Sequence, residues 1–206
     1  MKAIQGWAFP DSDELCAGAL LADVALVRSH WAHFAGERRV CVQAGGNCGI
    51  YPAALAEIFG VVYTFEPDAD NFRCLVANCK QPNVYAFRAA LGEKARTTGL
   101  HRVPNNVGMH WLEGDGTIPV LRIDDLGLPA CDLIALDIEG AELLALEGAA
   151  TTIERERPTV IVEEKDHSER FGTSPQAVTD WLRARGYTSP GHAKRDRIWL
   201  ASERIA

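Results

Sequence analysis

The amino-acid sequence predicts a doubly wound α/β fold with a mostly parallel sheet. Short apolar runs rich in β-branched residues alternate with stretches of helical periodicity along the chain, as expected for repeated βαβ units. Polar residues and glycines follow several of these runs directly, where doubly wound sheets hold their ligands. The chain has 206 residues and shows no linker or repeat. We therefore expect a single domain over residues 1–206, with an N-terminal segment at 1–36 and the core at 40–206.

The composition is that of an ordinary globular protein. Hydrophobic residues make up 47% and charged residues 24% of the chain, which is usual for a soluble domain. The formal net charge of −7 argues against a broad nucleic-acid or acidic-membrane surface. The sequence contains neither a signal-peptide pattern nor an apolar run long enough to span a membrane. Its six cysteines form no CxxC motif, so we expect reduced thiols in a cytoplasmic protein.

The N-terminal segment begins with an expected irregular stretch over residues 1–11. Trp7, Phe9 and Pro10 are unusual in a free tail, so we expect them to pack on the rest of the chain. Two interpretations stay open. These residues either cap the core, or they form part of a lid over a ligand site.

The next element is a predicted helix that begins at Ser12 or Asp13, either of which can cap it. It runs to about Phe34 and ends at Gly36. Residues at helical spacing give it one inner face. These are Leu15, Ala19, Ala22, Leu26, Ser29 and His33.

Residues 40–67 form a predicted β-turn-α-β unit. The first strand, 40–42, runs into a loop at 43–49 that contains three glycines. Glycine has no Cβ, so Gly45, Gly46 and Gly49 let the backbone turn sharply and approach a ligand closely. The helix that follows has its apolar residues at helical spacing. These are Ala53, Ala54, Leu55, Ile58 and Phe59.

The second strand of this unit, 61–65, ends in Glu66 and Pro67. Glu66 follows Gln43 by 23 positions, close to the offset of roughly 20 residues at which an acid binds a ribose diol in nucleotide-binding folds. The motif predicts a nucleotide-type ligand, which leaves a nicotinamide, a flavin and S-adenosylmethionine open. The glycine spacing is not G-x-G-x-x-G, which disfavours a dinucleotide.

A third helix follows, with Asp68 as its cap and Asn71 in its first turn, facing Glu66. Its expected inner face consists of Phe72, Leu75, Val76 and Cys79. A strand at 84–87 then leads to small residues at 89–92. Small residues at a strand end permit a flat group, such as an adenine, to lie against the backbone, although simple close packing explains them equally well.

Residues 93–120 are the least regular part of the chain, and we expect them to face the substrate. Short strands are predicted at 97–101 and 110–112, with a turn at 105–108. A further strand is expected at 120–123, followed by a helical turn at 123–126.

Two more strands end in acidic residues. The predicted strand at 133–136 runs into Asp137 and Glu139, and a helix with Glu142 in its first turn follows. The strand at 158–162 runs into the polar stretch 163–167. We expect a helix after Ser174 that ends at Gly186, and a terminal strand at 197–201.

These residues resemble the S-adenosylmethionine-dependent methyltransferases of the FkbM type. The match runs from about residue 40 to 167, with a looser tail to 200, and four pieces carry it: 43–49, 65–67, 136–142 and 158–163. The resemblance implies a Rossmann-like, seven-stranded class I methyltransferase sheet with one antiparallel strand near the C-terminus. It also implies methyl transfer, usually to an oxygen of a sugar, polyketide or similar small molecule.

The resemblance also implies roles for individual residues. The methionine part of the cofactor would meet the glycine loop, the ribose hydroxyls Glu66, and the adenine Ala90, while Asp137 would face the methyl-transfer cleft. The full expected cofactor set is Gln43, Gly45, Gly46, Asn47, Gly49, Glu66, Pro67, Asn71, Ala90 and Asp137.

The sequence departs from the family at two places. Gln43 stands where the family usually has an acid that meets the cofactor's charged end. The loss of that charge is expected to weaken binding about tenfold or more. The family often has a lysine at the position of Ala135 or Leu136. Both departures leave a weak or non-catalytic cofactor-binding member as an alternative.

Methylation of a hydroxyl is helped by a base. His167 is the first candidate, because it follows a strand end and its unperturbed titration range suits neutral pH; Asp137 and His110 come next. Glu139 and Glu163 are expected to bind substrate. Together with Asp137 they could also hold a divalent cation such as magnesium, although a site without metal is the expectation.

The expected partner is a small-molecule or carbohydrate acceptor, without nucleic acid or membrane. A nucleic-acid methyltransferase is disfavoured by the net charge and by the lack of an Asn/Asp-Pro-Pro-aromatic motif. An NAD-dependent oxidoreductase on a similar βαβ unit remains an alternative. The acceptor and the oligomeric state stay open.

Overall fold

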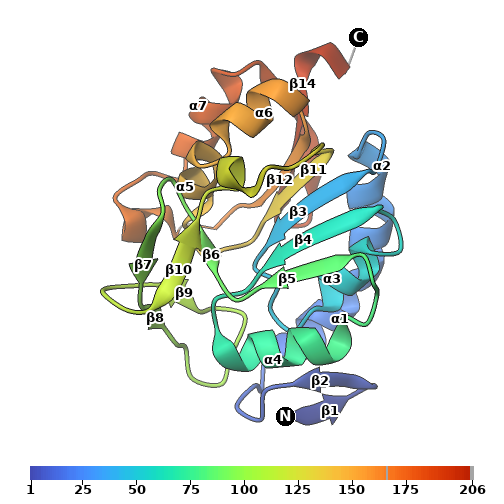
Figure 1. The fold of residues 1–206 in the computed structure, drawn as a ribbon, viewed down its shortest axis with the longest axis vertical. Helices are drawn as coiled ribbons and strands as arrows, with labels where there is room; N and C mark the ends of the chain where they lie inside the picture. The colour runs from blue at the N-terminus through green and yellow to red at the C-terminus, as the bar shows by residue number, and fades with distance from the viewer. Residues whose placement is uncertain (166, 205–206) are drawn as a thin grey trace.

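A computed structural model describes residues 1–165 and 167–204 of the chain (Figure 1). Its centre is a seven-stranded sheet in the order β13-β14-β12-β11-β3-β4-β5. All neighbours from β12 to β5 pair in parallel, and β14 runs antiparallel to both of its neighbours. The predicted α/β sheet with one antiparallel strand is thus confirmed. The strands are β3 (Val40–Ala44), β4 (Val61–Phe65), β5 (Val84–Phe87), β11 (Leu133–Leu136), β12 (Thr159–Glu163), β13 (Tyr187–Ala193) and β14 (Asp196–Ala201).

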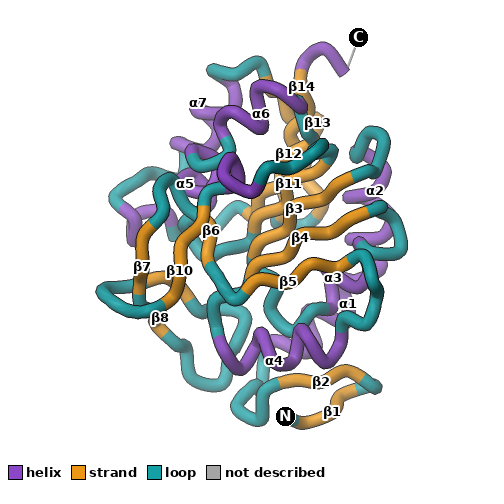
Figure 2. Tube along the Cα trace, in the orientation of Figure 1, coloured by secondary structure: helices purple, strands orange, loops and turns teal. Residues whose placement is uncertain are grey.

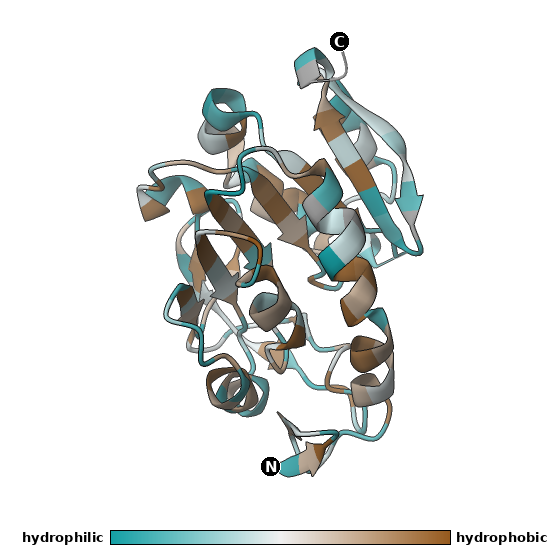
Figure 3. Cartoon of the chain, turned by 90° about the vertical axis from the view of Figure 1, so that its right-hand side faces the viewer, coloured by the Kyte–Doolittle hydropathy of each residue, from teal (hydrophilic) through white to brown (hydrophobic). Residues whose placement is uncertain are grey.

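The central strands are apolar on both faces because helices cover both sides of the sheet. Every residue of β3 and β11 is buried, and Figure 3 shows the central strands coloured hydrophobic. In the parallel register, Leu136 pairs with Ala44, and Ala44 pairs with Phe65. The carboxyl ends of β3, β4 and β11 therefore meet at one edge, and the loops that follow them lie side by side.

Helices lie on both faces of the sheet, as a doubly wound fold requires. One face packs against α1 (Cys16–Leu26), η1 (Val27–Trp31), α2 (Ala32–Phe34) and α3 (Ile50–Leu55). The other packs against α5 (Glu142–Glu147), α6 (Ala150–Glu156) and α7 (Ala177–Arg183). The remaining helix is α4 (Ala69–Asn78), and short 3₁₀ turns are η2 (Ile123–Leu126), η3 (Ser168–Phe171) and η4 (Ser202–Arg204).

The N-terminus is a β-hairpin, so the predicted irregular stretch at residues 1–11 is wrong. Strands β1 (Lys2–Ile4) and β2 (Trp7–Phe9) pair antiparallel, and the hairpin lies beside α4 (Figure 1). Phe9 is completely buried in an apolar cluster, and Asn78 of α4 bonds both backbone polar groups of Ala8. The hairpin therefore caps part of the core, which is the first of the two interpretations that the sequence leaves open.

The predicted single helix from Asp13 to Phe34 is broken into three pieces. The Asp13 carboxylate does cap its start, because it accepts the backbone N–H groups of Cys16 and Ala17. A π-helical turn, Val27–Trp31, then interrupts the α-helical ladder, as such turns often do at functional sites. The expected inner face is wrong, because Leu15 is 66% exposed and Ala19, Ala22, Ser29 and His33 are exposed as well.

Three other expectations need correction. The helix after the glycine loop ends at Leu55 rather than at Phe59, since residues 56–58 form turns. Val76, expected on the inner face of α4, is about half exposed. The strand β13 was not predicted, because Ser189, Pro190 and Gly191 within it suggest a turn; a register shift between Thr188 and Gly191 accommodates them.

The irregular region contains two small sheets that stand beside the main one (Figure 2). Strand β10 (Ile118–Leu121) lies between β6 (Ala90–Leu91) and β7 (Arg96–Thr98). Strands β8 (Leu100–His101) and β9 (Trp111–Leu112) pair antiparallel. Residues 99–115, here called the arm, extend from these strands. The predicted short strands at 97–101 and 110–112 thus correspond to β7, β8 and β9.

Among the residues that the structure describes, no helix is long and apolar enough to cross a membrane. All six cysteines are free, and five of them are buried.

Candidate functional site

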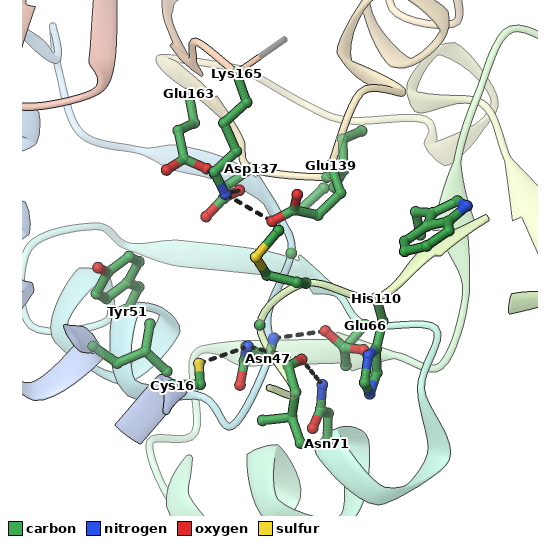
Figure 4. A pocket seen from close by; sticks show the side chains of 18 of the residues that line it. Cys16, Asn47, Tyr51, Glu66, Asn71, His110, Asp137, Glu139, Glu163 and Lys165 are labelled. Atoms are coloured by element: carbon green, nitrogen blue, oxygen red, sulfur yellow. Dashed lines mark hydrogen bonds and ion pairs between the residues drawn. The ribbon is translucent and has the colours of Figure 1, made fainter. Parts of the chain in front are cut away.

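A cavity of about 890 Å³ opens at the carboxyl ends of the central strands. Figure 4 shows its two polar sides. The Glu66 side carries Asn47, Glu66, Asn71 and His110, and the Asp137 side carries Asp137, Glu139, Glu163 and Lys165. The arm covers the cavity from one direction, and α1 with η1 covers it from another. The volume lies at the upper end of the range for a drug-sized ligand, so two small molecules have room here.

Glu66 lies at the end of β4 with its carboxylate held by backbone. Its Oε2 accepts the N–H of Asn47 at 2.7 Å, and its Oε1 accepts the N–H of Asp68 at 2.8 Å. Each carboxylate oxygen can accept a second hydrogen bond, so Glu66 retains capacity for ligand hydroxyls. Burial raises the pKa of Glu66 to about 7, because it outweighs the two backbone hydrogen bonds and a contact with the Asn71 side chain, which act in the opposite direction.

Asn71 lies beside Glu66, in the first turn of α4, and is 1% exposed. Its Nδ2 donates to the carbonyl of Val107 in the arm at 2.9 Å. Its Oδ1 has no hydrogen-bond partner within the described residues. Such an unpaired buried acceptor is unusual in a native protein and calls for an explanation, such as a bound ligand.

Gly45 is required where the glycine loop passes β11. Its φ of +82° is in the left-handed region, and a Cβ there would lie 2.0 Å from the carbonyl oxygen of Asp137. Gly45 therefore lets the end of β3 and the Asp137 turn meet at the cavity wall.

The other two glycines of the loop, Gly46 and Gly49, pack against α4 outside the lining of the cavity. A Cβ on Gly46 would meet Leu75, and one on Gly49 would meet Cys79 and the backbone of Leu75. Both glycines thus allow α4 to pack closely. They do not line the cavity, and a direct contact with a ligand stays a prediction for them.

Gln43 is also behind the wall, 1% exposed. Its Nε2 donates to the carbonyls of Ala44 and Gly45, and its Oε1 accepts the Thr64 hydroxyl at 2.6 Å. A glutamine satisfies these partners, since it supplies both donors and an acceptor. A carboxylate would face two carbonyl oxygens without a donor.

On the Asp137 side, three carboxylates from two neighbouring strand ends surround the ammonium of Lys165. Lys165 Nζ lies 2.7 Å from Glu139 and 3.4 Å from Asp137, and it also pairs with Glu163. These acids raise the pKa of Lys165 despite its burial. Burial and Asp137 in turn raise the pKa of Glu163 to about 9, against the opposing effect of Lys165.

The three carboxylates can be considered as a metal site, since their ligand atoms lie within 4.8 Å of one another. Lys165 already supplies a positive charge in their midst. A divalent cation held by all three acids would have to displace that ammonium.

His167 lies on the cavity wall and is oriented by Glu139. Its Nδ1 is 2.7 Å from Glu139 Oε2, and Glu139 is 2% exposed. With the Nδ1 proton directed at this carboxylate, Nε2 is left as the proton acceptor. Such an acid–histidine pair is a recurrent way to hold a general base in one tautomer.

The backbone around Glu139 is unusual. Glu139 has φ +58°, which non-glycine residues rarely adopt. Glu142 holds this turn, because its Oε1 accepts the N–H groups of Ile138 and Gly140. Burial raises the pKa of Glu142 to about 7. Predicted only as a helix-start acid, Glu142 thus also stabilises the turn that carries Asp137 and Glu139.

One end of the cavity is aromatic. Trp31 of η1 and Tyr51 of α3 meet edge to face, with ring centroids 5.7 Å apart. Trp31 Nε1 donates to Asp196 at 3.1 Å, and burial raises the pKa of Asp196 to about 6. The Asp23–Lys194 ion pair joins α1 to the β13–β14 turn nearby.

The structure thus brings most predicted residues to one cavity. Asp137, Glu139, Glu163, His110 and His167 line it. So do Gly45, Asn47, Glu66, Pro67, Asn71 and Ala90.

Sequence reasoning missed several residues of the cavity. Lys165 lies in the polar stretch 163–167 that follows a predicted strand, so the sequence carries a signal for it. Trp31, Tyr51 and Asp196 come from distant elements, and no local pattern brings them together.

The family model described as "Methyltransferase FkbM domain" matches residues 49–189. Among solved structures, the chain is similar to the methyltransferase FkbM from Methylobacillus flagellatus KT, with 22% identity and a TM-score of 0.54. The alignment covers 79% of this chain and 43% of that one, so this chain spans less than half the length of that protein. A search of curated proteins gives no match.

Two further structures share the fold. The precorrin 8W decarboxylase of Methanobacterium thermoautotrophicum is 15% identical, with a TM-score of 0.53 over 97% of this chain and 99% of that one. SMU.1697c of Streptococcus mutans, solved in complex with SAH, is 9% identical, with a TM-score of 0.50 over 86% of this chain and 95% of that one.

Proposed function

The chain belongs to the methyltransferase FkbM domain family, and from this premise we propose that it is an S-adenosylmethionine-dependent O-methyltransferase. The methyl acceptor would be a hydroxyl oxygen of a small molecule or sugar. The observation that carries the proposal is the buried carboxylate of Glu66, fixed by two backbone N–H groups at the cavity wall. The family favours methyl transfer over the NAD-dependent oxidoreduction that the βαβ unit alone left open.

The residues present fit this cofactor. Glu66 offers free acceptor capacity for ribose hydroxyls, and the unpaired Oδ1 of Asn71 offers a further acceptor. Ala90 supplies a small, buried surface at a strand end for the adenine. Asp137 and Asn47 would lie toward the methionine part, where the acids also suit a positively charged sulfonium. When bound, the cofactor supplies the electrophilic methyl group. The protein's task is to align the acceptor hydroxyl with that group and to exclude water from the pair.

Gln43 is compatible with this proposal. Its amide is fully used by Ala44, Gly45 and Thr64, so the neutral side chain holds the end of β3 in place. The cofactor would bind without the charge that the family usually supplies here.

His167 is the proposed general base. Glu139 accepts the proton of Nδ1, and Nε2 can then take the proton of an acceptor hydroxyl. Lys165 keeps Glu139 in place by an ion pair at 2.7 Å. In this assignment Glu139 is a positioning residue, while Asp137 and Glu163 remain available to bind acceptor hydroxyls.

A divalent cation is the weaker alternative for the three acids. Because Lys165 already supplies a positive charge among them, we expect turnover to be unchanged by a chelator. Loss of activity on chelation, restored by magnesium, would favour the metal instead.

Calorimetric titration with S-adenosylmethionine and S-adenosylhomocysteine tests the proposed function. We expect binding of both, followed by methyl transfer to a member of a panel of hydroxyl compounds. No heat with either ligand at millimolar concentration would refute the proposal. Binding without turnover on a broad panel would favour a non-catalytic cofactor-binding protein.

A further inference from the structure

We propose that Asn71 and His110 bind the adenosine part of the cofactor, with Asn71 Oδ1 as hydrogen-bond acceptor and His110 Nε2–H as donor. The inference rests on the proposed function, and it gives His110 a different role from the base predicted by sequence. It makes the arm, residues 99–115, part of the cofactor site.

The tautomer of His110 follows from its backbone contact. Nδ1 lies 3.0 Å from the backbone nitrogen of Val103, which can only donate. The ring must therefore accept at Nδ1, and the neutral imidazole carries its proton on Nε2. Protonation of the ring would place a second donor against the Val103 N–H and break this bond.

The surroundings of His110 also favour the neutral ring. Burial lowers its pKa, and the nearby Arg102 and His101 act in the same direction. Asp68 and Asp13 act in the opposite direction, but burial is the largest effect. A neutral ring with Nδ1 already occupied is a donor at Nε2 and is poorly suited to act as a base.

Asn71 presents the complementary group. Because Val107 accepts from Nδ2, the amide is turned so that Oδ1 is left over. The side chain is 1% exposed and lines the cavity. Figure 4 shows Asn71 and His110 close to Glu66 on the same side of the cavity.

The arm is held in the position that this role needs. The Val107 carbonyl accepts from both Asn71 and Asn47. Arg102 pairs with Asp68 at 2.6 Å, and Asp68 lies two residues after Glu66. The arm is thus tied to the glycine loop and to the start of α4, the two segments that also fix Glu66.

The pattern of donors and acceptors matches a nucleoside. Glu66 and Asn71 accept, as the ribose hydroxyls and the adenine amino group require, and His110 donates to a ring nitrogen or a ribose oxygen. Both the adenine edge and the ribose offer hydrogen-bond donors and acceptors of this kind. The experiment must therefore show which of the two Asn71 and His110 bind.

The test is calorimetric binding of S-adenosylhomocysteine to the wild-type chain and to Asn71→Leu, His110→Phe and His110→Gln. We expect about tenfold weaker binding for Asn71→Leu and for His110→Phe, as loss of one hydrogen bond predicts. His110→Gln keeps a donor and should bind within about threefold of wild type. Tyr85→Phe, at an exposed position of β5 outside the cavity lining, is the control and should bind as wild type does.

Two analogues of S-adenosylhomocysteine show whether Asn71 binds the adenine or the ribose. S-inosylhomocysteine lacks the amino donor, and the 2′-deoxy analogue of S-adenosylhomocysteine lacks one ribose hydroxyl. The analogue whose penalty disappears in Asn71→Leu identifies the group that Asn71 binds.

The outcomes separate this inference from the proposed function. If wild type binds and folded Asn71→Leu and His110→Phe, checked by thermal melting, bind equally well, only this inference is overturned. If the wild-type chain gives no heat, the proposed function fails and the inference falls with it.

Discussion

Nδ1 of His167 lies 2.7 Å from Oε2 of Glu139, and the two residues follow neighbouring parallel strands, β12 and β11. The pairing depends on the left-handed backbone at Glu139 and on Gly140, where a Cβ would lie 2.4 Å from the His167 carbonyl oxygen. Strand order and one glycine thus place an acid and a histidine in contact at the cavity wall.

Replacing His167 by Ala should lower turnover by roughly 10²–10⁴-fold, the usual contribution of a general base. Binding of S-adenosylhomocysteine should stay unchanged, because His167 pairs with Glu139 on the Asp137 side of the cavity and is not among the proposed cofactor contacts. The measurement is turnover on the best acceptor of the panel, together with calorimetry. Glu139→Gln should also slow turnover, while the exposed His33→Gln serves as control. Wild-type turnover in His167→Ala would remove this residue from the mechanism.

Binding of S-adenosylhomocysteine should depend on pH through Glu66. The pKa of Glu66 is about 7 in the free protein, and its ionised form accepts hydroxyl donors best. Affinity should therefore rise with pH through this range and be about tenfold higher at pH 8 than at pH 6. Calorimetry in buffers of different ionisation heat would detect the proton released on binding.

Glu66→Gln is the control for this pH dependence, since it cannot ionise and should show a flat profile. The same raised pKa makes the free protein less stable as pH rises from about 4.5 through about 7, because the folded state holds its proton longer than the unfolded state. An equally steep binding profile in Glu66→Gln would assign the titration to another group.

Gln43→Glu should destabilise the fold even though it restores the residue type usual in the family. The new carboxylate would be buried against the carbonyls of Ala44 and Gly45, with no donor between them. A loss of about 2–3 kcal/mol is expected, which lowers Tm by roughly 4–12 °C for a chain of this size. Gln5→Glu, in the exposed hairpin turn, should leave Tm unchanged. A more stable Gln43→Glu would show that the site is built for an acid.

Gly45→Ala should unfold or distort the cavity wall. The added Cβ would meet the Asp137 carbonyl at 2.0 Å, in a backbone conformation with φ +82°. We expect a loss of about 3 kcal/mol or more in denaturant unfolding. Gly127→Ala is matched, since Gly127 also has positive φ but has nothing within 4 Å of its Cβ position. It should cost roughly 1 kcal/mol, and equal costs at the two sites would contradict the packing argument.

Local patterns predicted much of this architecture. The β-branched runs at 40–42, 61–65 and 133–136 indicated central strands because both faces of a parallel strand are apolar. The polar residues after these strands indicated the cavity edge, since parallel strands end together. Asp13 and Asp68 were recognisable caps, and both accept the helix-start N–H groups as predicted.

The remaining features depend on contacts between distant segments. The hairpin at the N-terminus is stabilised by α4, and Trp31 meets Asp196 across 165 positions of sequence. The roles of Gly46 and Gly49 could not be separated from that of Gly45, because glycine serves close packing and ligand approach equally well. The Lys165 ion pairs required the order of β11 and β12 in the sheet, which no local motif encodes.

The most direct test of the central claim is a crystal structure of the chain with S-adenosylhomocysteine. We predict density in the cavity between Glu66 and Asp137, with the ribose hydroxyls within hydrogen-bond distance of the Glu66 carboxylate. A cavity closed by the protein's own side chains, or ligand density away from Glu66, would contradict the account.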